Sequence, residues 1–225
     1  ELPGYRHVSD SIVRAEFEHD WGVPILSEPG LRIPNMFEAA LDGEFMGLYI
    51  EGEDIGQSDP NTQHVTAALS AMECVVVQDL FLNETAKFAH VFLPGSTFLE
   101  KDGTFTNAER RISRVRRVMK PKSGFADWEI TQLLSNALGY PMNYAHPSEI
   151  MDEIARLTPT FSGVSYARLD ELGSIQWPCN ADAPDGTPTM HVNEFVRGKG
   201  RFMLTDYVPT TEKVNAKFPL ILTTG

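Results

Sequence analysis

Residues 45–94 have the sequence FMGLYIEGEDIGQSDPNTQHVTAALSAMECVVVQDLFLNETAKFAHVFLP, in which short apolar runs alternate with helical segments. The apolar runs have strand length and lack polar alternation; they are residues 45–50, 74–77 and 91–93. Asp59-Pro60 predicts the start of a helix that extends to about Met72, and Asn83 predicts the cap of a shorter one. Because strands and helices alternate, we expect a βαβαβ unit whose parallel sheet is covered on both faces. The predicted fold class is α/β, a parallel-sheet, Rossmann-like type of dinucleotide-binding domain with flanking helices and a long irregular excursion.

Helices are also expected before this unit. Ser9 or Asp10 caps a helix that ends before Gly22, and Asn35 caps a shorter helix that ends at Gly43.

The pattern changes after Pro94. Residues 112–118 alternate basic and apolar side chains, which is typical of an edge strand or a hairpin arm. Residues 158–198 are rich in Pro, Gly and Asp and show little periodicity, so we expect them to be irregular. The remaining predicted elements are helices at 127–139 and 148–157 and strands at 199–204 and 219–224.

These elements predict four regions along the chain. They are a helical lead-in at 1–43, the Rossmann-like domain at 44–157, an irregular excursion and linker at 158–218, and the start of a truncated C-terminal domain at 219–225. The last region is predicted because an apolar strand begins there and the sequence stops soon after it.

Composition excludes several classes of protein. The 225 residues are 42% apolar and 22% charged, which is typical of a globular chain, and no apolar run approaches the roughly 20 residues that span a bilayer. A net charge of −12 disfavours binding to nucleic acid.

Two cysteines do not suffice for a disulfide framework, an iron–sulfur cluster or a structural zinc site, and Cys74 is expected to be a buried thiol. Since no signal peptide is recognised, we expect a reducing, cytoplasmic location.

One segment is strongly basic in this acidic chain. Residues 101–122 carry eight Lys and Arg residues against two Asp and Glu. A bound polyanion, an acidic partner surface and a solvated hairpin face would each explain this pattern.

Polar residues follow each predicted strand, at the edge where open parallel sheets bind ligands. Asp54 and Asp79 follow the first two strands and form a possible acceptor pair for ribose hydroxyls or purine amino groups. The alternative is that each aspartate caps its own turn. A standard NAD-binding domain is disfavoured because no Gly-x-Gly-x-x-Gly motif opens either helix. None of the six histidines has the spacing of a metal site or a catalytic triad, so no catalytic constellation is predicted.

Four ordered motifs resemble those of the molybdopterin oxidoreductases. They are Leu48–Asp54, Val76–Asp79, Glu84–Ala86 leading to Phe92–Pro94, and Glu100–Arg111. Within that superfamily, three further segments resemble formate dehydrogenase catalytic (alpha) subunits, namely Pro3–Tyr5, Leu138–Tyr144 and Gly173–Cys179. The resemblance covers essentially the whole chain, which therefore looks like an internal segment of such a subunit.

The resemblance implies that this segment grips one of two pterin guanine dinucleotides that together carry molybdenum or tungsten. The cofactor contacts carried over by motif are Asp54, Gln78, Asp79, Lys101, Asp127, Thr224 and Gly225. Of these, Lys101 matches a contact to the anionic part of the cofactor, and the chain's last residues match the start of a cofactor-binding segment. Where His90 stands the family usually has aspartate, so no role is carried onto His90.

The resemblance also implies the activity of the whole enzyme, which oxidises formate to carbon dioxide. Electrons would leave through iron–sulfur clusters, to NAD through iron–sulfur and flavin partner subunits. In this family the metal ligand and the active-site histidine and arginine precede the matched region, so no catalytic or metal-ligating residue is expected within this segment.

Other functions stay open on the sequence. A non-catalytic scaffold subunit of a respiratory complex would share the fold without the cofactor, but it would not need Asp54, Gln78, Asp79 and Lys101 together. Another molybdopterin oxidoreductase, such as nitrate reductase, is disfavoured by the segments at 140–144 and 177–179. A stand-alone nucleotide-binding protein is a further alternative.

Overall fold

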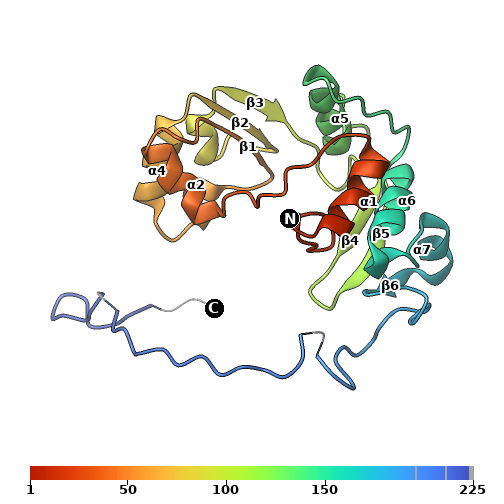
Figure 1. The fold of residues 1–225 in the computed structure, drawn as a ribbon. Coiled ribbons are helices and arrows are strands. Elements are labelled where there is room, and N and C mark those ends of the chain that lie inside the picture. The colour runs from red at the N-terminus through yellow and green to blue at the C-terminus, as the bar shows by residue number, and fades with distance from the viewer. Residues whose placement is uncertain (196, 211, 223–225) are drawn as a thin grey trace. The chain divides into compact units, whose positions relative to one another are not determined.

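The computed structural model describes residues 1–195, 197–210 and 212–222, and the chain divides into two compact units, residues 1–188 and 189–225. In the first unit, three strands form a parallel sheet in the order β1-β2-β3 (Figure 1). The strands are β1 (Gly47–Glu51), β2 (Cys74–Asp79) and β3 (Val91–Pro94). Glu51 lies opposite Gln78, and Asp79 lies opposite Pro94. The carboxyl ends of the strands therefore meet at one edge, and the predicted α/β fold is confirmed.

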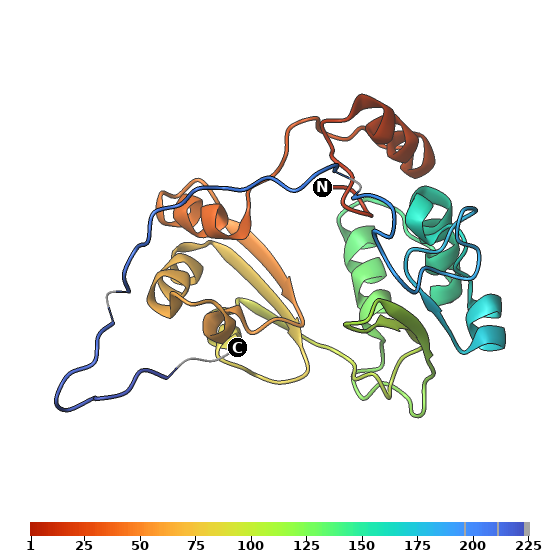
Figure 2. The ribbon, with the colours of Figure 1, turned by 90° about the horizontal axis from the view of Figure 1, so that it is seen from below.

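Short helices connect and cover these strands. They are α2 (Ile33–Leu41), α3 (Ile55–Ser58), α4 (Thr62–Ala71) and the 3-10 helix η1 (Thr85–Phe88). Helices α2 and α4 contact each other and lie side by side in both views (Figures 1 and 2). Their apolar side chains, among them Phe37, Val65 and Leu69, pack with Val75 and Val77 into one core. The apolar character of the strands follows from this packing.

Several predicted helix starts are shifted. Helix α4 begins at Thr62 and not at Asp59-Pro60, because Asn61 is its cap and accepts a hydrogen bond from the His64 amide at 3.3 Å. Helix α2 begins at Ile33 and contains a proline in its first turn, although Asn35 was the predicted cap. The cap predicted at Asn83 is confirmed by its 2.9 Å hydrogen bond from the Ala86 amide.

The expectation of a buried Cys74 is wrong. Cys74 is the first residue of β2 and is exposed, whereas Val75 and Val77 are buried. Successive side chains of a strand point to opposite faces, so the apolar run at 74–77 has only alternate residues in the core.

A second, antiparallel sheet follows in the order β4-β5-β6. Its strands are β4 (Gly103–Thr106), β5 (Arg111–Val115) and β6 (Ser174–Gln176). The alternating segment at 112–118 was predicted to be an edge strand or hairpin arm. It does form a hairpin with β4, but β5 is the central strand, because β6 pairs with its other side.

The remaining helices of the first unit are α1 (Ser11–Trp21), α5 (Asp127–Ala137), α6 (Pro147–Leu157) and α7 (Tyr166–Leu172), with the 3-10 helix η2 (Pro159–Phe161). Of these, α6 and α7 lie beside the second sheet (Figure 1). A second core joins β5 and β6 to α6 and α7, and includes Ile112, Met151, Leu169 and Ile175. The caps predicted for α1 are confirmed: the Asp10 side chain accepts from two amides, and Gly22 closes the helix at φ +68°. Among the helices of the described residues, none has the length and apolar character needed to cross a membrane.

Part of the region predicted to be irregular is ordered. Residues 158–188 contain η2, α7 and β6, which were missed because each element spans seven residues or fewer and shows no readable period. Local signals were nevertheless present, since Ser165 caps α7 by accepting from the Arg168 amide at 3.3 Å.

The second unit contains no helix or strand among its described residues, 189–195, 197–210 and 212–222. The strand predicted at 199–204 is therefore wrong; Phe202 is 98% exposed and Leu204 is 99% exposed, with no neighbouring strand to bury them. The strand predicted at 219–224 is absent from 219–222, and its last two residues lie outside the described residues. The limits of the four predicted regions of the chain stay a prediction.

Candidate functional site

A cleft of about 350 Å³ lies at the carboxyl edge of the parallel sheet. We call it the strand-end cleft; it is lined by Glu51, Gly52, Gln78, Asp79, Leu80, Gly95, Ser96, Thr97, Phe98, Lys101, Phe105 and Asp127. Its position is where open parallel sheets bind ligands. Four of the seven predicted cofactor contacts, Gln78, Asp79, Lys101 and Asp127, line this one cleft.

Gln78 forms the floor of the strand-end cleft and is only 1% exposed. Its amide nitrogen donates to Glu51 Oε1 at 3.2 Å and to Asp127 Oδ1 at 3.0 Å. Its amide oxygen accepts a hydrogen bond from the Tyr49 hydroxyl. The side chains of Tyr49 and Glu51 share one face of β1 because they are two residues apart, and the pairing of Glu51 with Gln78 brings them to the same amide. Gln78 therefore holds two carboxylates in place.

Asp127, the first residue of α5, connects three parts of the chain. Its carboxylate accepts from the Ser96 amide at 3.1 Å, from the Ser96 hydroxyl at 3.0 Å and from Gln78, and it forms an ion pair with Lys101. Burial opposes ionisation, but the hydrogen bonds from Lys101, Ser96 and Gln78 outweigh it and hold the pKa of Asp127 below its ordinary value. Asp127 is therefore a carboxylate at neutral pH and fixes the Lys101 ammonium at the cleft.

Gly95 makes this close arrangement sterically possible. A Cβ at this position would lie 2.9 Å from Asp127 Oδ1 and 3.4 Å from the backbone carbonyl of Asp79. The Asp127 carboxylate therefore approaches the backbone at residue 95 more closely than a side chain there would allow, whereas the Asp79 carbonyl lies at an ordinary contact distance.

Asp79 lines the cleft beside its own turn. One carboxylate oxygen accepts from the Leu80 amide at 2.6 Å and the other from the Asn83 side chain at 2.9 Å. Asp79 thus caps its own turn, as the alternative expectation has it, and also lines the cleft, while its contact with a ligand stays a prediction.

Asp54 lies apart from the residues that line the cleft. Its carboxylate accepts from the amide and hydroxyl of Thr85, at 3.0 and 2.6 Å, and from the Gln57 side chain at 2.6 Å. Although burial opposes it, these bonds lower the pKa of Asp54. In this arrangement Asp54 ties the loop after β1 to η1, and its contact with a cofactor stays a prediction. Thr224 and Gly225, also predicted contacts, lie outside the described residues.

Most arginine side chains of the basic segment at 101–122 form hydrogen bonds or ion pairs with other residues of the chain. Arg110 donates to the carbonyls of Trp177, Thr187 and Pro188, and Arg111 pairs with Glu109. Arg114 and Arg116 both pair with Asp170 of α7, and the Arg114 guanidinium lies 3.7 Å from the centre of the Tyr166 ring. Arg111 also donates to the Ser174 hydroxyl at 3.2 Å. Four arginines therefore contact residues 166–188, and none of the four lines the strand-end cleft.

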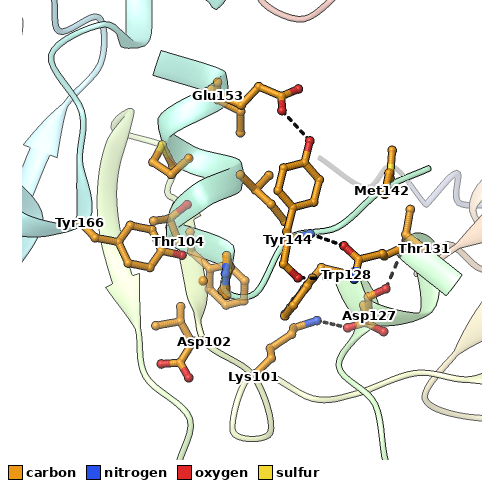
Figure 3. A pocket seen from close by; sticks show the side chains of 18 of the residues that line it. Lys101, Asp102, Thr104, Asp127, Trp128, Thr131, Met142, Tyr144, Glu153 and Tyr166 are labelled. Atoms are coloured by element: carbon orange, nitrogen blue, oxygen red, sulfur yellow. Dashed lines mark hydrogen bonds and ion pairs between the residues drawn. The ribbon is translucent and has the colours of Figure 1, made fainter. Parts of the chain in front are cut away.

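A second hollow, the aromatic cavity, adjoins the cleft and has a volume of about 530 Å³. Glu51, Lys101, Phe105 and Asp127 line both spaces. Figure 3 shows Lys101 directed at Asp127, with the rings of Trp128, Tyr144 and Tyr166 around the cavity. Burial and the hydrogen bond to Glu153 raise the pKa of Tyr144, so its hydroxyl stays protonated at neutral pH.

Sequence reasoning missed Glu51 as a site residue. The first strand was predicted to end at residue 50, whereas β1 continues to Glu51 and places this side chain at the edge of the sheet. The signal was the spacing of Tyr49 and Glu51, which are two residues apart and so share a face once the strand is extended by one residue.

His90 has a structural position. Its Nδ1 accepts the Val75 amide at 2.9 Å, and its own amide donates to the Val75 carbonyl at 2.8 Å. These bonds join the entry of β3 to β2, so His90 supplies an acceptor at a position where an aspartate could do the same.

The charges of the cleft indicate what it can bind. Of the described residues that line it, Lys101 is the sole lysine or arginine, facing the carboxylates of Glu51, Asp79 and Asp127. Acceptors in excess suit a group rich in hydrogen-bond donors, such as an aminated heteroaromatic base or a ribose, with the ammonium available to one anionic or carbonyl group. Within the described residues, no three His, Cys, Asp or Glu side chains are placed to hold a metal ion.

A parallel sheet with a polar cleft beyond its strand ends places the first unit in the class of open α/β domains, which bind ligands at that edge. A family model described as "Molybdopterin oxidoreductase" matches residues 24–137, which include the parallel sheet, the strand-end cleft and the whole of α5. The chain belongs to the molybdopterin oxidoreductase family.

Named relatives support the same assignment. A Staphylococcus haemolyticus protein named "Putative formate dehydrogenase" is 48% identical over 91% of this chain, and Bacillus subtilis "Probable oxidoreductase YjgC" is 44% identical over 90%. The chain spans about a fifth, 21%, of the length of each of these relatives. Among solved structures, acetylene hydratase from Pelobacter acetylenicus shares the fold, with a TM-score of 0.55 and 18% identity over 81% of this chain and 27% of its own.

The family implies a molybdopterin cofactor, and the chemistry of the strand-end cleft fits the nucleotide end of such a group. Guanine offers a ring N–H and an amino group as donors and a carbonyl as acceptor. The carboxylates of the cleft match the donors, and Lys101 matches the acceptor or a phosphate. Glycine at position 95 leaves the strand-end backbone bare toward Asp127, as close ligand and side-chain approach requires.

Proposed function

We propose that this chain is the segment of a molybdenum- or tungsten-dependent formate dehydrogenase that holds one guanine dinucleotide of its cofactor. The observation that carries the proposal is the strand-end cleft, in which Gln78, Asp79, Lys101 and Asp127 converge from different parts of the sequence. The names of the relatives support formate as the substrate of the parent enzyme.

Each residue of the cleft has a part in this function. Asp79 and Asp127 present carboxylate oxygens to donors of the nucleotide, Gln78 fixes the floor, and Lys101 supplies the positive charge. Asp54, fixed by Thr85, would meet the cofactor from the loop after β1. When bound, the cofactor supplies a metal centre that takes up the two electrons of formate oxidation.

The remaining steps belong to the parent protein. We propose that electrons leave through iron–sulfur clusters to NAD, through iron–sulfur and flavin subunits, in the cytoplasm. Thr224 and Gly225 are proposed to begin a further cofactor-binding segment. The residues that ligate the metal are proposed to lie in the part of the enzyme that precedes this segment.

The test is the guanine nucleotide content of the purified parent enzyme. Lys101→Ala, Asp79→Asn and Asp54→Asn should each lower the amount of guanine nucleotide released per polypeptide, because each weakens a contact to the dinucleotide. Lys87→Ala is a matched control, since Lys87 is an exposed lysine paired with Glu84 away from the cleft. A wild-type enzyme without guanine nucleotide would contradict the proposal and favour the scaffold subunit. Variants that keep their nucleotide but lose turnover would contradict the assigned roles.

A further inference from the structure

Glu51 lies at the candidate site, although the sequence motifs do not predict it as a cofactor contact. It lines both the strand-end cleft and the aromatic cavity, at the junction of the two spaces. Phe105 lines both spaces as well and presents an exposed ring there. A carboxylate and an aromatic ring therefore border the same two spaces, and this combination can recognise the edge and the face of a planar heteroaromatic ring.

The carboxylate of Glu51 is oriented by a buried group. The amide nitrogen of Gln78 donates one hydrogen bond to Glu51 Oε1 at 3.2 Å and one to Asp127 Oδ1. The amide oxygen of Gln78 accepts a hydrogen bond from the Tyr49 hydroxyl. Because both amide protons and the amide oxygen of Gln78 are engaged, its amide has one orientation, and this orientation sets the position of Glu51 Oε1.

The second carboxylate oxygen of Glu51 is open. Within the described part of the chain it has no hydrogen-bond partner and no ion pair, whereas the oxygens of Asp79 and Asp127 already accept from the protein. Among the carboxylates that line the cleft, Glu51 thus has the largest remaining capacity to accept from a ligand.

We propose that Glu51 is a further binding residue of this site, and that its open oxygen accepts a hydrogen bond from the amino or ring N–H edge of a bound guanine base. The inference rests on the proposed function and extends it to a residue outside the motif contacts. The base, and not the ribose, is assigned to Glu51 because the ring of Phe105 lies at the same junction.

The electrostatics of the junction agree with this role. Partial desolvation raises the pKa of Glu51 even though the residue as a whole is exposed, Asp127 raises it further and Lys101 opposes the rise. An N–H donor at the open oxygen would offset that cost, so binding favours the ionised carboxylate.

The experiment follows the loss of guanine nucleotide from the purified parent enzyme with time in dilute urea. Glu51→Gln keeps an oxygen for Gln78 but turns a donor toward the base, and Glu51→Ala removes the acceptor without adding a donor. Both variants should lose the nucleotide about tenfold faster than wild type, the effect of one charge-assisted hydrogen bond. The control is Glu53→Gln, an exposed glutamate two residues away that accepts from Ser58 and lines neither space.

The outcomes separate the inference from the proposed function. Faster loss from both Glu51 variants at an unchanged unfolding temperature, with Glu53→Gln equal to wild type, supports the role of Glu51. Retention equal to wild type in both variants overturns it and leaves the proposed function standing. Absence of guanine nucleotide from the wild-type enzyme overturns both.

Discussion

At the scale of single residues, one buried amide organises the candidate site. Gln78 is only 1% exposed, so solvent has little access to replace its hydrogen bonds, and its amide nitrogen donates to the carboxylates of both Glu51 and Asp127. The sequence motifs predict Gln78 as a site residue, but they do not predict its hydrogen bonds to Tyr49, Glu51 and Asp127 within the chain.

Replacing Gln78 by leucine should therefore destabilise the protein although the volume changes little. The substitution leaves the two carboxylates and the Tyr49 hydroxyl without their shared partner, which costs about 2 kcal/mol. Thermal unfolding of the variant beside wild type measures this loss. An unfolding temperature equal to wild type would mean that water replaces the amide without cost, and would contradict a buried role for Gln78.

The charge of Asp127 predicts a dependence of stability on pH. Its pKa in the folded chain is lowered from the ordinary value of 3.8, so its ion pair with Lys101 stabilises the fold above that pH. The stabilisation is lost as the pH falls below 3.8 and the carboxylate takes up a proton. Denaturant titrations between about pH 5 and 3 should show wild type losing more stability than Asp127→Asn. If the free energy of unfolding falls equally with pH in both proteins, the ion pair between Lys101 and Asp127 does not stabilise the fold.

At the scale of elements, residues 166–188 depend on arginines in β5 and immediately beside it. Arg114 has a side chain only 9% exposed, stacked on Tyr166 and paired with Asp170, whereas the Arg116 side chain pairs with the same aspartate but is 63% exposed. The two residues provide a matched pair of contacts to α7 that differ in burial.

Arg114→Met should lower stability by about 1–2 kcal/mol, because it removes a desolvated stacking contact and leaves part of the Asp170 pair. Arg116→Met should cost less than about 0.5 kcal/mol, as exposed ion pairs usually do. Limited proteolysis within 158–188 and thermal unfolding report the difference. Guanine nucleotide content should stay at the wild-type level in both variants; a loss without a change in stability would place these arginines in the cofactor site instead.

The elements also show how far the sequence leads. The parallel sheet follows from its three apolar runs, and Asp10 and Asn83 cap helices as their side-chain chemistry predicts. The segment 158–188 could not be derived in the same way, because its order comes from long-range contacts such as Arg110 with Thr187 and Pro188, more than 70 residues apart. The sequence motifs predicted four residues that line the strand-end cleft, Gln78, Asp79, Lys101 and Asp127. They did not predict Glu51, because its position at the cleft depends on where β1 ends and how it pairs with β2.

At the scale of the whole molecule, the chain spans about a fifth of the length of its named relatives. The function proposed above places the metal ligands in the part of the parent enzyme that precedes this segment. Within the described residues no three His, Cys, Asp or Glu side chains are placed to hold a metal.

The purified 225-residue chain should therefore show no formate-dependent dye reduction, even when supplied with cofactor and metal. The assay compares it with the parent enzyme and with a boiled sample of the chain. Activity above the boiled sample would mean that the active site lies within this segment.

The bare backbone at residue 95 has a consequence for how this sequence can change over generations. A Cβ there would lie 2.9 Å from Asp127 Oδ1, so even alanine, which adds no chemical function, would require the Asp127 carboxylate to shift. That carboxylate is held by Ser96, Gln78 and Lys101, so the shift would disturb those contacts as well. Gly103, a few residues further on, has open space beside it and carries no such restriction. We therefore expect substitutions to be tolerated less well at position 95 than at position 103 as the sequence diverges.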